Sequence, residues 1–141
     1  MNEFSSTAIK DLLRQAGLRA TPARIATLAL MSKVSKPLSH AEVSEKLADM
    51  DMDKATIFRN LNDLTNVNLL RRTELGDHVW RFEMMNQHGR EASAHPHFLC
   101  IDCGEVSCVD NSYVTAPHPK LGEEIGTVSE IVFRGHCNNC E

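Results

Sequence analysis

The chain has 141 residues, 42% of them hydrophobic and 5% aromatic, which suits one domain of ordinary size or two small ones. No apolar run is long enough to span a bilayer, and the N-terminal segment is amphipathic with acidic residues, which excludes a signal or transit peptide. We therefore expect a cytoplasmic protein with no membrane partner, in which paired cysteines are more often metal ligands than disulfides.

The net charge of −4 is distributed unevenly along the chain. Residues 1–83 contain 12 Lys and Arg against 11 Asp and Glu, whereas residues 84–141 contain 3 against 8. The chain is therefore no polycation, and a nucleic acid would be bound by a few placed cations of the first part.

The first half of the chain predicts four helices, each with an apolar stripe at helical spacing. The first follows the polar cluster Ser5–Thr7, and the other three begin at the N-caps Thr21 before Pro22, Ser39 with Glu42 as a capping box, and Asp53. The inward stripes include Ile9, Leu12, Leu13, Ile25, Leu28, Met31, Val43, Leu47, Ile57, Leu61 and Leu64. Gly17 can end the first helix, and Asn68 can end the fourth in the left-handed conformation.

Strands at 69–74 and 78–83 flank the tight-turn signal Leu75-Gly76-Asp77. Short helices followed by a β-hairpin are typical of a winged helix-turn-helix domain, and its recognition helix is the last one before the hairpin. Residues 84–94 are polar and indicate a hinge. A small β-rich unit follows, with strands at 98–103 and 130–137.

The strongest chemical signal is a pair of CxxC motifs, Cys100–Cys103 and Cys137–Cys140. A turn of this spacing aims two thiolates at one point, and two such turns form a tetrahedral four-thiolate site that suits structural zinc. A single CxxC would leave a redox dithiol open, but two in one small unit favour zinc. The zinc would hold together a unit too small to be stable alone.

Two further patterns are weaker. In His95-Pro96-His97 the two histidines point to the same side of an extended segment, so both imidazoles can reach one metal. On the fourth helix, Thr56, Arg59, Asn60 and Asp63 are expected to face outward, and Arg and Asn are the side chains that read guanine and adenine edges. Arg19 and Arg24 are candidate phosphate contacts. Surface histidines and a solvated helix face are the alternative interpretations.

The order of motifs GLRATPAR, PLSHAEV, DKATIFRNLNDL, WRFE, HPHFLCIDCG and GHCNNC resembles the ferric uptake regulator (Fur) family, over about residues 10–140. The resemblance implies a metal-dependent transcription repressor that binds a double-stranded DNA operator as a homodimer, and no enzyme. It implies an α+β fold with a winged-helix DNA-binding domain at 1–83, a hinge at 84–94, and a small zinc-stapled α/β metal-binding and dimerisation domain at 95–141.

The resemblance also assigns two metal sites. It places the family's structural zinc on the four CxxC cysteines, and a sensing metal on Glu83, His95, His97 and Cys108. A thiolate ligand shifts preference from iron or manganese towards zinc, so we expect zinc as co-repressor, as in the zinc-sensing branch. The alternatives are an iron- or peroxide-sensing member of the same family and, from other classes, a thiol redox protein or a zinc-knuckle module that binds no DNA.

On the fourth helix the family's TVYR motif appears as residues 56–59, which makes Phe58 the base-contacting aromatic, and Arg19 fits a basic residue near the minor groove. Three features depart from the family pattern. Pro37 stands where many members have a histidine ligand, and Pro96 removes an acid that a second site needs. Residues 111–130 lack the pattern of the long dimerisation helix. His40, His78 and His88 are further candidate ligands.

Overall fold

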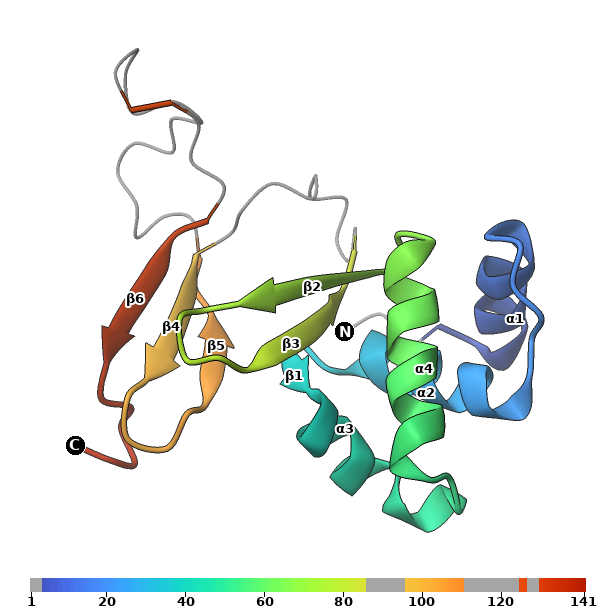
Figure 1. Ribbon diagram of the computed structural model, residues 1–141, viewed down its shortest axis with the longest axis horizontal. Helices are drawn as coiled ribbons and strands as arrows, with labels where there is room; N and C mark the ends of the chain where they lie inside the picture. The colour runs from blue at the N-terminus through green and yellow to red at the C-terminus, as the bar shows by residue number, and fades with distance from the viewer. Residues whose placement is uncertain (1–3, 86–95, 111–124, 127–129) are drawn as a thin grey trace. The chain divides into compact units, whose positions relative to one another are not determined.

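The computed structural model describes residues 4–85, 96–110, 125–126 and 130–141 (Figure 1). The chain divides into two compact units, Met1–Gly89 and Arg90–Glu141, and this division falls within the expected hinge at 84–94. Most of that hinge lies outside the described residues, together with His88, His95 and most of 111–130, where the sequence lacks the pattern of the long dimerisation helix. No helix among the described residues is long and apolar enough to cross a membrane.

The described part of the first unit contains four α-helices and a short 3-10 helix, and the helices α1 to α4 are labelled in Figure 1. They are α1 (Ser6–Gln15), α2 (Pro22–Lys33), α3 (His40–Lys46), η1 (Ala48–Met50) and α4 (Lys54–Asn66). The three expected N-caps are confirmed, because the side chains of Thr21, Ser39 and Asp53 each accept a backbone N–H three residues ahead. Ser5 caps α1 in the same way. The capping box of α3 is complete, and Asn68 adopts a positive φ of 62° after α4.

An antiparallel sheet with the order β1-β3-β2 completes this unit. Its strands are β1 (Leu38–Ser39), β2 (Leu70–Glu74) and β3 (Trp80–Met84). The β2–β3 hairpin is confirmed, whereas β1 was not expected, because two residues carry no alternating pattern. The core contains the inward side chains expected of all four helices, joined by Leu38, Leu70 and Phe82 from the three strands.

The hairpin turn is stabilised by two carboxylates. The Glu74 side chain accepts hydrogen bonds from the backbone N–H groups of Gly76 and His78. Asp77 forms a bidentate pair with Arg81, at 3.1 and 2.7 Å, and the Arg81 side chain is only 4% exposed. Burial tends to raise the pKa of the Asp77 carboxyl, but hydrogen bonds from Arg81 and from the Val79 backbone outweigh it and lower that pKa.

Replacing Asp77 by asparagine should therefore destabilise the first unit by about 2 kcal/mol at neutral pH, because it removes the carboxylate that forms a bidentate pair with the buried Arg81 guanidinium. Trp80 is the chain's single tryptophan and lies on β3, so its fluorescence during urea unfolding reports this unit. A carboxyl group whose pKa is lowered in the folded state stabilises that state at pH values above its ordinary pKa. This contribution is lost as the pH falls through the lowered pKa. The difference between variant and wild type should thus shrink below about pH 4.

The matched control is Asp49→Asn, which changes an exposed carboxylate on η1 and should leave the unfolding midpoint unchanged. Equal midpoints for Asp77→Asn and wild type at pH 7 would show that the Asp77–Arg81 pair contributes nothing to the stability of the hairpin.

The second unit is built on a three-stranded sheet with the order β5-β4-β6. Its strands are β4 (His97–Cys100), β5 (Val106–Cys108) and β6 (Val132–Gly135). β4 pairs antiparallel with β5 and parallel with β6. Gly135 lies against the Phe98 ring, where an added Cβ would be 3.3 Å from a ring carbon. Among the described residues of this unit, the buried hydrophobic side chains are Leu99, Cys100 and Val106. Such a small core indicates that the unit depends on further stabilisation.

Candidate metal centres and nucleic-acid interface

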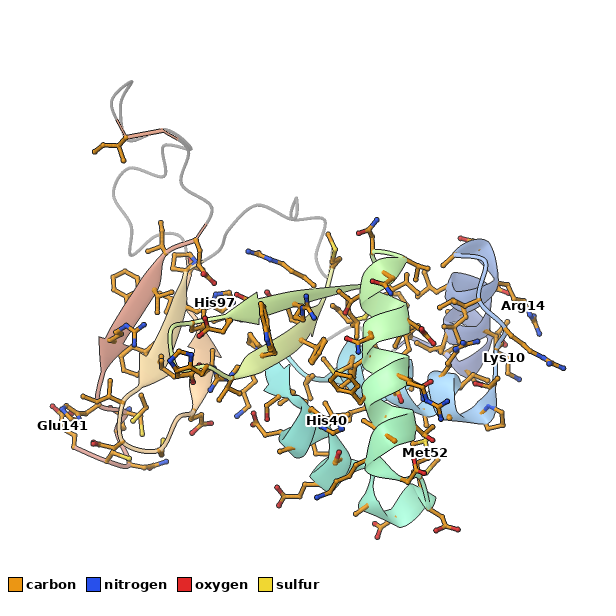
Figure 2. All side chains as sticks on the ribbon, viewed as in Figure 1. Lys10, Arg14, His40, Met52, His97 and Glu141 are labelled. Carbon is orange, nitrogen blue, oxygen red and sulfur yellow. The ribbon has the colours of Figure 1, made fainter. Side chains whose placement is uncertain are left out.

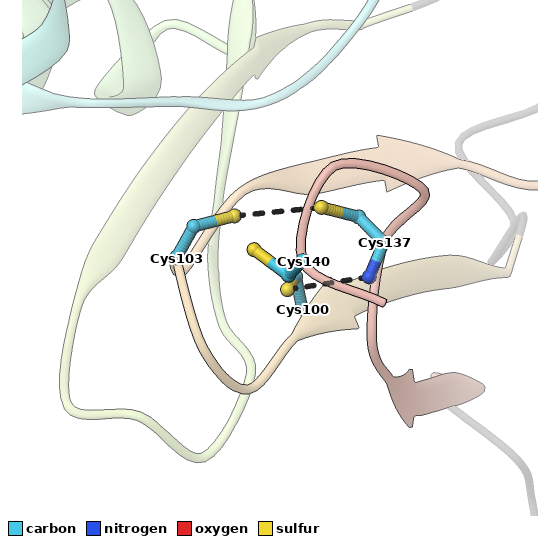
Figure 3. A group of neighbouring side chains, drawn as sticks. All are labelled: Cys100, Cys103, Cys137 and Cys140. Carbon is cyan, nitrogen blue, oxygen red and sulfur yellow. Dashed lines mark hydrogen bonds between the residues drawn. The ribbon is translucent and has the colours of Figure 1, made fainter.

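The four CxxC cysteines meet at one end of the second sheet (Figure 3). Cys100 ends β4 and Cys137 follows β6, and because these strands are parallel neighbours their turns lie at the same end. The Gly104 N–H donates to the Cys100 carbonyl and the Cys140 N–H to the Cys137 carbonyl, which closes both turns. The four sulfur atoms lie within 4.8 Å of one another, and Cys103 Sγ is 3.8 Å from Cys137 Sγ. A zinc–sulfur bond of about 2.3 Å gives tetrahedral edges of about 3.8 Å, so the cluster fits zinc.

The acidity of these thiols supports the same conclusion. Backbone N–H groups of Cys103 and Cys137 donate to the Cys100 sulfur and lower the pKa of that thiol to about 6. The adjacent Cys137 thiol raises the pKa of Cys140 to about 12. The protein alone thus favours a thiolate at one position and opposes it at another. A divalent cation would remove that conflict. All five cysteines of the chain are free thiols.

A contact between His136 and Asp102, which no sequence motif indicates, joins the two cysteine turns. His136 Nδ1 contacts Asp102 Oδ2. Asp102 directly precedes Cys103, and His136 directly precedes Cys137. The partners are far apart in the sequence, so no local pattern indicates the pair. It adds a second link between the turns and supports the orientation of the sulfur atoms.

His97 and Cys108 lie directly opposite each other on β4 and β5. Directly opposed residues of an antiparallel pair share a face of the sheet, and here a ligand atom of each lies within 4.8 Å of the other. His97 is fully buried, whereas Cys108 is exposed. This unit therefore presents an imidazole and a thiol together, a donor set that zinc accepts. Glu83 is a buried carboxylate on β3 of the first unit, opposite Arg71.

The outward face of α4 carries Arg59 and Phe58, which is 50% exposed, while Thr56 is half-buried. The expectation that Asn60 faces outward is wrong, because its side chain is only 7% exposed. Asn60 follows Ile57 by three residues and precedes Leu64 by four, so the helical period places it on the inner face.

Arg19 and Arg24 differ in what their side chains do. Arg24 donates to the Arg19 carbonyl at 3.0 Å and forms an ion pair with Asp63 on α4 at 3.1 Å. Arg24 therefore connects the loop before α2 to the helix that carries Arg59. Arg19, in that loop, is exposed.

Comparison with known protein families identifies the family of this chain. The model of the ferric uptake regulator family matches residues 15–131. The chain belongs to this family. By this membership it is a metal-responsive transcriptional regulator. The family consists of transcription regulators and not of enzymes, and its members bind DNA and form dimers.

Individual members of the family are similar to this chain in sequence and in fold. The chain is 34% identical to the ferric uptake regulation protein of Haemophilus ducreyi over 100 residues, which cover 67% of this chain and 64% of that protein. The crystal structure of the Vibrio cholerae ferric uptake regulator covers 91% of this chain and 98% of its own, with a TM-score of 0.74 and 24% identity. The structure of a zinc uptake regulator in complex with zinc and DNA matches 95% of this chain and 91% of its own chain, with a TM-score of 0.60 and 19% identity.

The described residues also locate the chain's departures from the family pattern. Pro37, at the position of a frequent histidine ligand, is buried. His40 bonds through Nε2 to the Lys54 carbonyl, which engages that nitrogen within the first unit. His78 lies on the hairpin turn with a positive φ of 62° and is exposed. Neither histidine belongs to a cluster of metal-binding side chains among the described residues.

Proposed function

We propose that the protein is a zinc-responsive repressor, in which a sensing zinc raises affinity for an operator. The observation that carries the proposal is the opposed pair of His97 and Cys108. Iron(II) sites favour imidazole and carboxylate ligands, whereas a thiolate beside an imidazole favours zinc. The nearest alternative is iron sensing, which the name of the Haemophilus ducreyi relative favours.

The proposed sites divide between two roles. Cys100, Cys103, Cys137 and Cys140 hold a structural zinc that stabilises the unit from residue 95 to 141. Glu83, His95, His97 and Cys108 hold the sensing ion, which would be coordinated by one carboxylate, two imidazoles and one thiolate. A tetrahedron of these ligands is complete without a fifth group, and the buried Pro37 supplies none.

Residues 1–83 are the proposed winged-helix domain, with α4 as its recognition helix and the β2–β3 hairpin as its wing. The exposed and buried faces of α4 support this assignment, because Arg59 and Phe58 are exposed while Ile57 and Leu61 pack inward. The hinge at 84–94 joins it to a dimerisation domain, and the protein acts on a double-stranded DNA operator in the cytoplasm.

The regulation follows from linkage. When bound, zinc would hold Glu83 to His95, His97 and Cys108 and so favour one relative arrangement of the two domains. If that arrangement presents two recognition helices to two half-sites, zinc and operator each raise the affinity for the other by the same factor. Equal affinity of zinc for both arrangements would produce no regulation.

The deciding experiment uses the full chain with its structural zinc retained and the sensing metal removed. Fluorescence anisotropy with a labelled duplex from the promoter of the protein's own gene is measured against added Zn²⁺, Mn²⁺ or, without oxygen, Fe²⁺. We expect Zn²⁺ to give tight binding at the lowest free concentration. Tight binding with Fe²⁺ alone would identify an iron sensor, and no binding with any metal would favour a redox protein or a zinc-knuckle module.

The DNA interface is tested by two substitutions with different expected signatures. Arg59→Ala should weaken binding of the preferred duplex by roughly 1–3 kcal/mol and relax base preference, because a guanidinium that reads a base edge is lost. Arg19→Ala should weaken binding to all sequences alike and reduce the salt slope by about one, as expected for a backbone contact. Both quantities come from anisotropy titrations at several salt concentrations with excess zinc.

Lys33→Ala serves as the control, because Lys33 is an exposed cation in the last turn of α2 and is no part of the proposed interface. If Arg59→Ala and Arg19→Ala bind as tightly as Lys33→Ala, with unchanged base preference, α4 is not the recognition helix.

A further inference from the structure

His40 is a histidine that neither metal site uses, and its backbone is held firmly in the first unit. It is the first residue of α3, directly after the N-cap Ser39. The Ser39 side chain accepts the Glu42 N–H at 3.2 Å, and the Glu42 carboxylate accepts the Ser39 N–H at 3.1 Å. Ser39 also belongs to β1, which pairs with β3 of the hairpin. The His40 ring therefore projects from a point fixed by both a cap and a strand.

From this point the ring reaches the first turn of α4 (Figure 2). Nε2 lies 2.9 Å from the Lys54 carbonyl oxygen, so this nitrogen carries the proton and donates it. The ring centroid is 5.6 Å from that of Phe58, and the two planes meet at 74°, an edge-to-face arrangement. In an α-helix the carbonyl of residue 54 also accepts the N–H of residue 58. His40 thus contacts the backbone and the side chain of the same helical turn.

Phe58 needs a neighbouring side chain to hold its ring in one orientation if that orientation is to contribute to DNA recognition. It is 50% exposed, and an exposed aromatic side chain on a helix can occupy more than one χ1 rotamer. A ring that must be ordered on binding loses affinity, and a ring already held in place does not. Among side chains that read bases, phenylalanine contacts the methyl group of thymine in the major groove, which requires a defined ring position.

We propose that His40 is a positioning residue for DNA recognition: it holds the Phe58 ring against the start of α4 in the orientation that reads a thymine methyl group. This role rests on the proposed function, because it assumes that α4 lies in the major groove. It gives the histidine a task in base preference and none in metal binding.

The test compares His40→Gln, Phe58→Ala and the double variant in the full chain with excess zinc. Glutamine retains a donor for the Lys54 carbonyl and loses the ring, so the first unit stays folded, as Trp80 fluorescence during urea unfolding can verify. The probe is a pool of duplexes with randomised sequence, from which wild type and each variant select binders. The selected sequences give a base-preference profile, and anisotropy on the duplex preferred by wild type gives affinity.

We expect His40→Gln to weaken binding about threefold to tenfold, the size of an aromatic pair, and to flatten the profile at the same base pairs as Phe58→Ala. In the Phe58→Ala background the His40 substitution should have no further effect. Glu45→Ala, an exposed residue of the same helix, is the matched control and should leave the profile unchanged.

The inference would be overturned by additive effects of the two substitutions on affinity, or by loss of bound zinc from His40→Gln, which would make His40 a ligand. An unchanged profile for His40→Gln where Phe58→Ala flattens it would also overturn it, with the recognition helix still supported. If Phe58→Ala itself leaves the profile unchanged, the failure extends to the assignment of α4 in the proposed function.

Discussion

Replacing Cys100 by serine should unfold the second unit and leave the first one folded. The second unit buries few apolar side chains among its described residues, so a structural metal has to supply much of its stability. Structural zinc sites in small domains contribute about 10–16 kcal/mol of apparent binding free energy near neutral pH, and this free energy is coupled to folding. Cys100 is also the buried member of the cluster, and the backbone N–H groups around it favour its thiolate.

Three measurements check this expectation in the full chain. Mass spectrometry under native conditions should show the loss of one zinc ion, and limited proteolysis should cleave within 96–141 while residues 4–85 resist. Urea unfolding followed by Trp80 fluorescence should keep the wild-type midpoint. Cys137→Ser should behave in the same way, whereas Cys108→Ser, outside the cluster, should keep the structural zinc. A Cys100→Ser variant that retains a tightly held zinc and a protected second unit would refute the four-cysteine site.

The elements of the first unit could be predicted from the sequence because their signals are local. A cap residue and its helix lie within three or four positions, as for Ser39 with Glu42 and for Thr21 before Pro22. The same holds for Asn68, whose positive φ was expected at the end of α4. Each signal reflects a hydrogen bond or a backbone conformation inside a short segment, so the sequence alone carries it.

Contacts between distant segments that carry no motif were not predicted. The strand β1 has only two residues and exists because β3 is beside it. The Arg24–Asp63 and Asp102–His136 pairs each join segments more than thirty residues apart. Nothing in the local pattern marks either partner, so the hydrogen bonds of the Arg24 guanidinium to Asp63 and to the Arg19 carbonyl were not expected. The role of Arg24 as a phosphate contact stays a prediction.

Asn60 shows a different kind of error. Its chemistry favours a base contact, and its position at the edge of the apolar stripe allows either orientation. The stripe Ile57, Leu61 and Leu64 leaves room for a fourth inward position, and the period of 3.6 residues assigns it to residue 60. In such a case the angular position of a residue around the helix axis predicts whether its side chain faces inward better than its residue type does.

The metal sites show which ligand groups the spacing of residues in the sequence can predict. The two CxxC motifs predict a shared cluster, and the parallel pairing of β4 with β6 explains why the two turns meet. The partnership of His97 and Cys108 came only from family resemblance, because eleven positions separate them. Their register across β4 and β5 now gives a physical reason for it.

Replacing Cys108 by aspartate should convert the proposed zinc response into a weaker and less selective one. The substitution exchanges a soft thiolate for a carboxylate at a similar distance from the backbone, which retains the charge but lowers the preference for zinc. We expect zinc-dependent DNA binding to require at least about tenfold more free zinc, and the response to Mn²⁺ or Fe²⁺ to improve relative to zinc. The measurement is the anisotropy titration of the promoter duplex against each metal under buffered free-metal conditions.

Cys108→Ala and Ser107→Ala complete the experiment. Alanine at 108 removes the ligand altogether, so the zinc response should be lost, whereas Ser107, the exposed neighbour on β5, should be replaceable without effect. The structural zinc has to remain in both variants, since Cys108 is not part of that cluster. If Cys108→Ala keeps the zinc affinity and the zinc-dependent DNA binding of wild type, Cys108 is no ligand. The donor set would then contain only imidazole and carboxylate, which is the set that iron(II) favours, and the zinc assignment would give way to iron.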